Sequence, residues 1–156
     1  MTKRQLGPFL IEPVGLGCMS LSHAYGPPPA DEDGARLLNR ALDLGYDFLD
    51  TASIYGVGHN ETLIGKALKG RRDEFVLASK CGLRVGNDEA RATRILDGSP
   101  RGIAEVLDLS LQRLGVDHID LYYLHRLDPK TPIEESVGAL ADAVKAGKIR
   151  SIGLSE

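Results

Sequence analysis

The sequence predicts an α/β fold built around a parallel sheet. Short apolar runs of strand length alternate with amphipathic segments of helix length, in the order β-α-β-α-β-α-β-α-β. A glycine follows each amphipathic segment, the usual place for a helix to end: Gly45, Gly70, Gly115 and Gly147. Regular alternation of this kind is typical of parallel strands joined by right-handed crossovers.

The first third of the chain predicts a hairpin and the first two strands of the sheet. Residues 5–12 form a short hairpin with Gly7-Pro8 as its turn, and a strand follows near Pro13–Gly17. A helix is expected over Asp33–Leu44, because its apolar residues recur at the spacing of one helix face. Tyr46–Asp50 is then a short strand.

The middle third continues the alternation and then interrupts it. Asn60 is expected to cap a helix whose apolar residues again share one face. Phe75–Ser79 is nearly all apolar, as expected of a strand covered on both faces. The polar segment Gly82–Ser99 is predicted to contain no regular element, and connections of that length are uncommon and often functional.

The last third predicts two helices and two strands. Ser99-Pro100 begins a helix with Ser as the N-cap and Pro at the first helical position, and His118–His125 is the next strand. Residues 131–134 read TPIE, which predicts a capping box at the start of another helix. Ile149–Ser155 is the final strand.

Composition places the chain among soluble proteins of one domain. Its length is 156 residues, with 42% hydrophobic and 26% charged residues. A net charge of −3 gives no electrostatic reason to expect nucleic acid. No apolar run approaches the roughly 20 residues that span a bilayer, so no membrane partner is expected.

The cysteines and histidines predict neither a disulfide nor a metal site. Cys18 and Cys81 do not form a CxxC pair and are expected to be reduced thiols of a cytoplasmic protein. His23, His59 and His118 share no metal-ligand spacing.

Arginines gather around the long polar segment and allow two interpretations. They are interleaved with acidic residues, so a solvated loop of mixed charge is favoured over an anion site. The residues concerned are Arg84, Arg91, Arg94 and Arg101, with Asp88, Glu89 and Asp97 between them.

Polar residues stand where three successive strands end. They are Asp50, Lys80 and His125, and Tyr55 lies five residues beyond Asp50. Parallel strands are spaced by about 4.8 Å, so side chains at the same level of neighbouring strands lie close together. In both an open doubly wound sheet and a (β/α)8 barrel, active sites form at this edge.

These residue types suit delivery of a proton to an oxygen that is gaining negative charge. A tyrosine hydroxyl has a pKa of about 10 and is a poor acid at neutral pH, but a nearby ammonium stabilises its phenolate. Lys80 supplies that ammonium, Asp50 holds Lys80 in place, and His125 donates a hydrogen bond to the substrate oxygen. The expected chemistry is carbonyl reduction.

In these segments the chain resembles the aldo-keto reductases. The resemblance covers almost the whole chain and rests on GLGCMS, GYDFLDTASIYG, LASKCG, SLQRLGVDHIDLYYLHRLD and GKIRSIGLSE, in this order. It implies a (β/α)8 TIM barrel that uses NADPH, or less often NADH, to reduce small carbonyl substrates. It also implies that the cofactor lies across the strand ends without a dinucleotide-binding GxGxxG motif.

The resemblance assigns roles to individual residues. Tyr55 is implied as the general acid, Lys80 and Asp50 as the groups that tune it, and His125 as the residue that orients the carbonyl. The implied cofactor contacts are Gly17, Cys18, Met19, Asp50 and Ser155. Glu156, which stands where many members have Asn, is a weaker candidate.

The resemblance also implies what this chain lacks. Members continue through three further strands, which supply much of the cofactor and substrate sites, so residues 1–156 are expected to be the N-terminal half of the barrel domain, with about five strands and four helices. The fragment is expected to be inactive alone. The alternative is a non-catalytic binding subunit that keeps the barrel and the cofactor.

Overall fold

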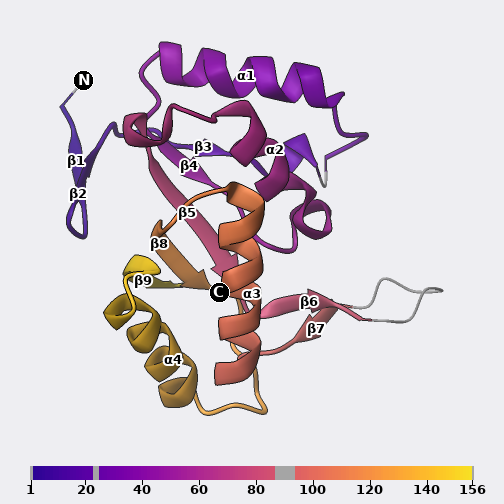
Figure 1. Cartoon of the computed structure of the whole chain (residues 1–156), viewed down its shortest axis with the longest axis vertical. Coiled ribbons are helices and arrows are strands. Elements are labelled where there is room, and N and C mark those ends of the chain that lie inside the picture. Colours follow the sequence, from indigo (N-terminus) through magenta and orange to yellow (C-terminus); the bar gives the residue numbers. More distant parts are fainter. Residues whose placement is uncertain (1, 23–24, 87–93, 156) are drawn as a thin grey trace.

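A parallel sheet of five strands forms the centre of the computed structural model, which describes residues 2–22, 25–86 and 94–155 (Figure 1). The strand order is β3-β4-β5-β8-β9, and every neighbouring pair is parallel. The strands are β3 Leu16–Gly17, β4 Phe48–Asp50, β5 Val76–Cys81, β8 Ile119–Leu124 and β9 Ile149–Leu154. The predicted α/β class with a parallel sheet is confirmed.

The helices form a second layer on one side of the sheet. They are α1 Asp31–Asp43, α2 His59–Ala67, α3 Pro100–Leu114 and α4 Ile133–Lys145. Each helix packs against the next, and α3 and α4 also contact the strands beneath them (Figure 1). A doubly wound sheet reverses its strand order at a switch point, and these five strands never reverse. Successive right-handed crossovers therefore place all four helices on the same face.

The hydrophobic core lies between the helix layer and the sheet. Its members come from the apolar stripes that the sequence predicts for the helices and from the strands they cover. The largest fully buried apolar side chains are Tyr122, Leu38, Leu49, Ile64, Leu77, Ile103, Leu107, Ile119, Leu140 and Ile149. The strands carry buried residues on consecutive positions, which explains their nearly continuous apolar sequence.

The N-terminal hairpin is confirmed. Strands β1 Arg4–Leu6 and β2 Phe9–Ile11 pair antiparallel around the Gly7-Pro8 turn. The Asp47 carboxylate, at the amino end of β4, accepts hydrogen bonds from Lys3 at 2.7 Å and from the Glu12 amide at 2.8 Å. These contacts fix the hairpin to the amino edge of the sheet.

A second hairpin occupies part of the segment predicted to contain no regular element. Strands β6 Leu83–Val85 and β7 Arg94–Leu96 pair antiparallel, and they project from the carboxyl edge of the sheet (Figure 1). All three residues of β7 are exposed, so this strand has no buried face and no alternation of apolar and polar residues. For that reason the residue pattern did not predict a strand here.

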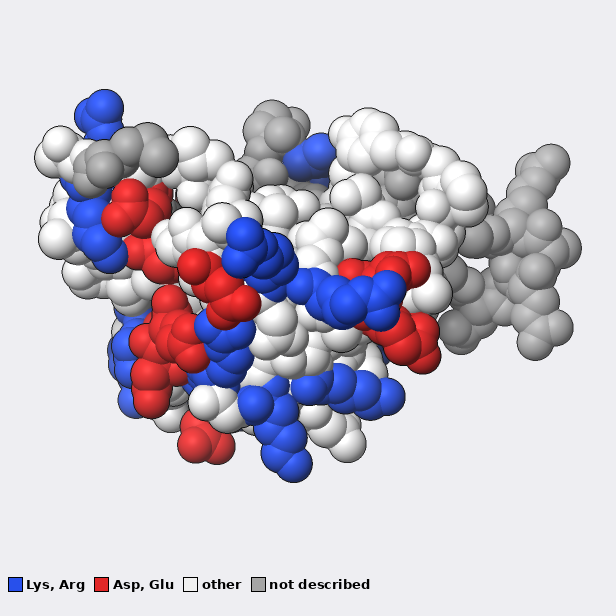
Figure 2. All heavy atoms as spheres, turned by 90° about the horizontal axis from the view of Figure 1, so that it is seen from above, with Lys and Arg blue, Asp and Glu red and all other residues white. Residues whose placement is uncertain are grey.

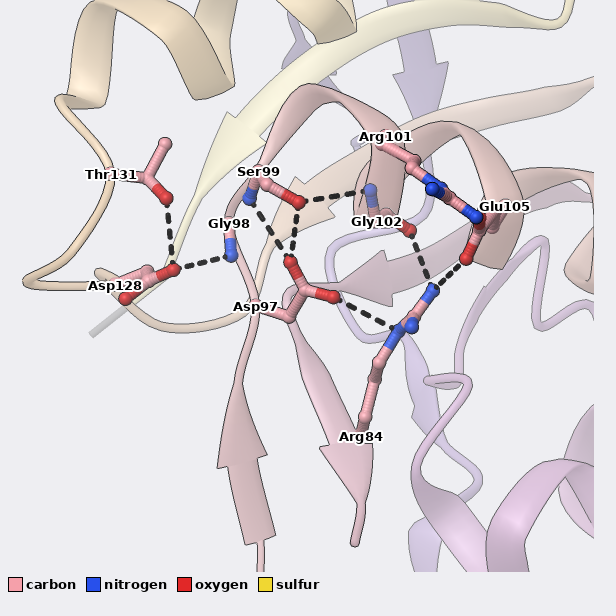
Figure 3. A network of polar contacts seen from close by, with 9 residues as sticks. All are labelled: Arg84, Asp97, Gly98, Ser99, Arg101, Gly102, Glu105, Asp128 and Thr131. Carbon is pink, nitrogen blue, oxygen red and sulfur yellow. Dashed lines mark hydrogen bonds and ion pairs between the residues drawn. The ribbon is translucent and has the colours of Figure 1, made fainter.

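Ion pairs fix the base of this hairpin to α3 (Figure 3). The Arg84 guanidinium lies 3.3 Å from Asp97 and 2.7 Å from Glu105, and Arg101 lies 2.7 Å from the other oxygen of Glu105. Mixed-charge pairing is therefore confirmed for Arg84 and Arg101. Arg91, Asp88 and Glu89 lie outside the described residues.

Two of the three predicted helix caps are wrong. Ser99 does cap α3, because its hydroxyl accepts the Gly102 amide at 3.1 Å (Figure 3). Asn60, in contrast, lies inside α2, whose N-cap is Gly58. Thr131 does not cap α4: its hydroxyl donates to the Asp128 carboxylate at 3.0 Å. In both failures the polar side chain bonds outside the helix that it was predicted to cap: Asn60 bonds to other segments, and Thr131 bonds within the loop before α4.

The surface carries charges of both signs. Figure 2 shows Lys and Arg side chains interspersed with Asp and Glu on the face seen from above. Several of these charges form ion pairs, such as Arg71 with Asp43 at 2.9 Å and with Glu74 at 2.7 Å. None of the helices described here is long and apolar enough to cross a membrane. Cys18 and Cys81 have free thiols, as predicted, and both residues are buried.

Candidate active site

The four residues at the strand ends come together at the carboxyl edge of the sheet. Asp50 ends β4, Lys80 is the penultimate residue of β5, and His125 follows β8 directly. The His125 amide still continues the sheet ladder, donating to the Cys81 carbonyl at 2.9 Å. Tyr55 begins the short 3-10 helix Tyr55–Gly58, in the loop between β4 and α2.

The Lys80 ammonium is the centre of this cluster. It donates to Asp50 Oδ2 at 2.6 Å and to the Thr51 carbonyl at 2.8 Å, and it lies 3.4 Å from the Tyr55 hydroxyl. The Lys80 residue is only 7% exposed, so water screens these contacts weakly. The carboxylate balances the buried charge, and the third contact of the ammonium is directed at the phenol oxygen.

His125 stands beside Tyr55 as a neutral imidazole. The two rings are edge to face, with centroids 6.0 Å apart and an angle of 83° between their planes. Burial, and then the positive charges of Lys80, Arg126 and Arg94, lower the pKa of His125 to about 4. Its buried Nδ1 has no hydrogen-bond partner among the described residues. A neutral imidazole has one donor and one acceptor nitrogen, so His125 can bond to an incoming polar group.

The loop after Tyr55 adopts an unusual backbone conformation. Gly56, Val57 and Gly58 all have left-handed φ values, of 57°, 54° and 91°. A side chain at position 58 would also collide with the Arg113 guanidinium, 2.4 Å from where a Cβ would stand. The β-branched Val57 tolerates this region poorly, so surrounding contacts must hold the loop in place.

The predicted cofactor residues lie at the same edge. Gly17 ends β3 opposite Asp50, and the Cys18 amide donates to the Asp50 carbonyl at 2.8 Å. Burial raises the pKa of the Cys18 thiol to about 12, so this residue offers its backbone and not a thiolate. Met19 is half-buried and begins the 3-10 helix Met19–Leu21.

Ser155 reaches this edge from the last strand. Its amide donates to the Leu124 carbonyl at 3.0 Å, and its hydroxyl accepts a long hydrogen bond of 3.4 Å from Arg126. Arg126 also donates to the His125 carbonyl at 2.9 Å, which links the ends of β8 and β9. Glu156 lies outside the described residues.

Sequence reasoning missed two groups that complete the cluster. The Thr51 carbonyl is the second acceptor for Lys80, and a backbone acceptor of this kind leaves no signal in residue type. Asn60 is fully buried behind the site and bonds to Thr51. Asparagine is a common N-cap residue, so its type predicted a helix cap and not a buried residue inside α2.

Comparisons with known proteins agree with this geometry. The model of the aldo/keto reductase family matches residues 13–156. A curated relative, an aldo-keto reductase of Schizosaccharomyces pombe whose name specifies NADP(+), is 46% identical over 155 residues, covering 98% of this chain and 45% of the relative. The chain thus spans about half the length of the curated relatives it matches.

Solved structures give the same result. An aldo-keto reductase from Bacillus halodurans, in its holo form, has a TM-score of 0.86 at 38% identity, over 99% of this chain and 50% of that one. A glycerol dehydrogenase from Gluconobacter oxydans has a TM-score of 0.88 at 35% identity, over 98% of this chain and 48% of that one. The chain belongs to the aldo/keto reductase family.

Proposed function

We propose that this member of the aldo/keto reductase family carries the catalytic residues of an NADPH-dependent oxidoreductase that reduces aldehydes and ketones to alcohols. The observation that carries the proposal is the position of one buried ammonium. Lys80 lies 3.4 Å from the Tyr55 hydroxyl and 2.6 Å from Asp50, at the edge where this class of fold places its chemistry.

Tyr55 is the proposed proton donor. As a substrate carbonyl is reduced, its oxygen gains negative charge, and the Tyr55 O–H bond breaks to deliver a proton to that oxygen. The phenolate left behind faces the Lys80 ammonium, which stabilises it in a site with little water. Asp50 pairs with the ammonium and holds it in position beside the phenol.

His125 is the proposed orienting residue. Because its pKa is lowered to about 4, the imidazole is neutral at pH 7 and does not compete with Tyr55 as an acid. It stands edge to face with the Tyr55 ring, so a hydrogen bond from its free N–H would hold a carbonyl oxygen near the phenol.

The residues at this edge suit the nicotinamide end of the proposed cofactor. At Gly17 nothing lies within 4 Å of where a Cβ would stand, so a ligand can approach the backbone closely. Gly17, Cys18, Met19, Asp50 and Ser155 would hold the group. When bound, NADPH supplies the hydride. NADPH is proposed over NADH because the Schizosaccharomyces pombe relative is named for NADP(+).

We also propose that residues 1–156 are the N-terminal half of a (β/α)8 barrel domain. Support comes from a strand order that does not reverse and from relatives about twice as long. The proposed partner is therefore a small carbonyl substrate, bound by the complete barrel. The cytoplasmic location remains a prediction from the two buried free thiols.

The test is an NADPH oxidation assay with a small aromatic aldehyde. We expect a full-length protein containing residues 1–156 to consume NADPH in step with alcohol formation. The 156-residue chain alone should show negligible turnover and poor solubility. A full-length protein that binds NADPH but reduces no aldehyde or ketone would refute the enzyme and favour a non-catalytic binding subunit.

A further inference from the structure

We propose that Asn60 is a positioning residue that fixes the loop after β3 to the loop that carries Tyr55. The inference rests on the proposed function for its catalytic meaning, because the two loops are those assigned to the cofactor and to the proton donor. The link that Asn60 makes between the two loops does not depend on that assignment and can be tested separately.

The Asn60 side chain links three backbone segments. It is fully buried, and its amide nitrogen donates to the Cys18 carbonyl at 2.8 Å and to the Ser22 hydroxyl at 2.9 Å. Its amide oxygen accepts from the Thr51 hydroxyl at 2.6 Å. Both amide protons are used, and none of these partners belongs to α2, the helix that contains Asn60.

Two of the three partners of Asn60, Thr51 and Cys18, are one step from the Lys80–Asp50 pair. The Thr51 carbonyl receives the Lys80 ammonium at 2.8 Å, and the Cys18 amide donates to the Asp50 carbonyl at 2.8 Å. Asn60 therefore holds both Thr51, whose carbonyl binds Lys80, and Cys18, whose amide pairs with Asp50. Movement of the side chain would shift both.

The link extends to the backbone that follows Tyr55. Gly56 packs against Ser22, since a Cβ at position 56 would stand 2.9 Å from the Ser22 Cβ. The Ser22 hydroxyl also lies 2.8 Å from His59 Nδ1, and His59 Nε2 lies 2.9 Å from Asp31. With a neutral His59 protonated on Nε2, the hydrogen bonds run in one direction from Asn60 to Asp31. This chain supports the left-handed turn at its base.

The two buried thiols allow a direct measurement of this link. Cys18 is in the loop that Asn60 binds, and Cys81 is at the end of β5, with its thiol 3.4 Å from the Tyr123 carbonyl. Both thiols are free and buried, so iodoacetamide reaches each of them only when the surrounding structure opens, and the alkylation rates report local opening. Cys81 is thus an internal reference within the same molecule.

The experiment is iodoacetamide labelling of the full-length protein without cofactor, followed by peptide mass spectrometry. In Asn60→Ala we expect the Cys18 rate to rise about tenfold or more while the Cys81 rate changes less than about twofold. Thr51→Val removes one of the three bonds at constant volume and should give a smaller rise at Cys18. It also keeps the test available if Asn60→Ala does not fold.

The matched control is Asn39→Ala. The Asn39 amide donates to the carbonyls of Ala35 and Ala67, each at 3.0 Å, and links α1 to the end of α2 away from the site. We expect it to leave the ratio of Cys18 to Cys81 labelling unchanged. Equal acceleration of both thiols in Asn60→Ala would mean global loosening and would overturn the proposal, as would an unchanged Cys18 rate.

Turnover gives the second readout. With an aldehyde substrate, Asn60→Ala should lower kcat about tenfold or more, and Asn39→Ala should stay within about twofold of the unchanged protein. A wild-type protein without reductase activity would refute the proposed function, and the labelling result would still decide the role of Asn60. Selective opening of Cys18 with unchanged kcat would overturn the catalytic meaning of the link.

Discussion

The two edges of the sheet each carry one buried charge paired with an opposite charge, but they use that pair differently. At the carboxyl edge, β5 provides Lys80, which pairs with Asp50 at 2.6 Å. At the amino edge, β8 provides Asp120, which pairs with Arg72 at 2.5 Å. One member of each pair, Lys80 or Asp120, is buried, with less than a tenth of its side chain exposed.

At the amino edge, both oxygens of the Asp120 carboxylate have partners. One Asp120 oxygen accepts from Arg72 and from the Leu77 amide at 2.8 Å, and the other lies 3.3 Å from Arg150 and 3.6 Å from His118. At the carboxyl edge, by contrast, the Lys80 ammonium has a long contact with a phenol, and the neighbouring His125 Nδ1 has no partner among the described residues. Saturated charges stabilise a fold, whereas incompletely satisfied ones can bind and react with a ligand.

The strongest test of this difference is Lys80→Met at the carboxyl edge. Loss of the ammonium should lower kcat for aldehyde reduction by about 100- to 1,000-fold, because the phenolate loses its stabilising charge. Asp120→Asn should leave kcat within about twofold. Steady-state kinetics measures kcat for both variants. Equal losses of kcat would show that the two edges do not differ in their role in catalysis.

Asp120→Asn should instead destabilise the fold. The substitution leaves the cations around it without their buried carboxylate, which costs about 3 kcal/mol of the free energy of unfolding. Urea denaturation followed by circular dichroism measures this loss, with Asp120→Glu as the conservative control. A cost below about 1 kcal/mol would show that the amino edge is not a stabilising cluster.

Acidification should weaken the carboxyl edge through His125. Its pKa in the folded protein is about 4, below the ordinary value near 6.5, so between these values the unfolded chain binds a proton that the native protein does not. Stability is therefore fully present above about pH 7 and is lost as the pH falls toward 4, by up to about 3 kcal/mol. Denaturation at several pH values should show this slope, and His125→Asn should reduce it.

At the amino edge, His118→Gln should change the pH slope much less. Burial and two arginines also lower the pKa of His118, but the Asp120 carboxylate opposes that shift. If removal of His118 flattened the slope more than removal of His125, the assignment of the pH response to the carboxyl edge would be wrong.

The smallest effect is expected where charges are exposed. Arg101 pairs with Glu105 at the base of the β6–β7 hairpin, and its side chain is 89% exposed (Figure 3). Arg101→Ala should shift the thermal midpoint by less than about two degrees, and 1 M salt should remove the difference. A larger shift by differential scanning fluorimetry would mean that this surface network contributes to the fold.

Much of the fold could be predicted because its signals are local. The parallel strands at Asp50, Lys80 and His125 could be predicted from apolar runs that end in a polar residue. The Ser99 cap of α3 could be predicted because the Gly102 amide that it accepts is only three residues away. The clustering at the carboxyl edge then follows from parallel pairing alone.

The remaining features depend on contacts between distant segments. Asn60 has the residue type of a cap, but it bonds to Thr51 and Cys18 on other segments, which no local pattern encodes. Thr131 bonds instead to Asp128 within its own loop, a local alternative to capping α4. The Thr51 carbonyl at Lys80 is a backbone group and leaves no trace in the sequence. The strands of the β6–β7 hairpin have three residues each, and β7 has no buried face, so periodicity could not find the hairpin.

The most direct test of the central claim is the turnover of Tyr55→Phe in the full-length protein. This change removes one hydroxyl and keeps the ring that packs beside His125. Aldehyde reduction should fall at least about 1,000-fold, while the affinity for NADPH, measured by calorimetric titration, should stay as in the unchanged protein. A Tyr55→Phe variant that reduces the aldehyde at the full rate would contradict the role of Tyr55 as the proton donor.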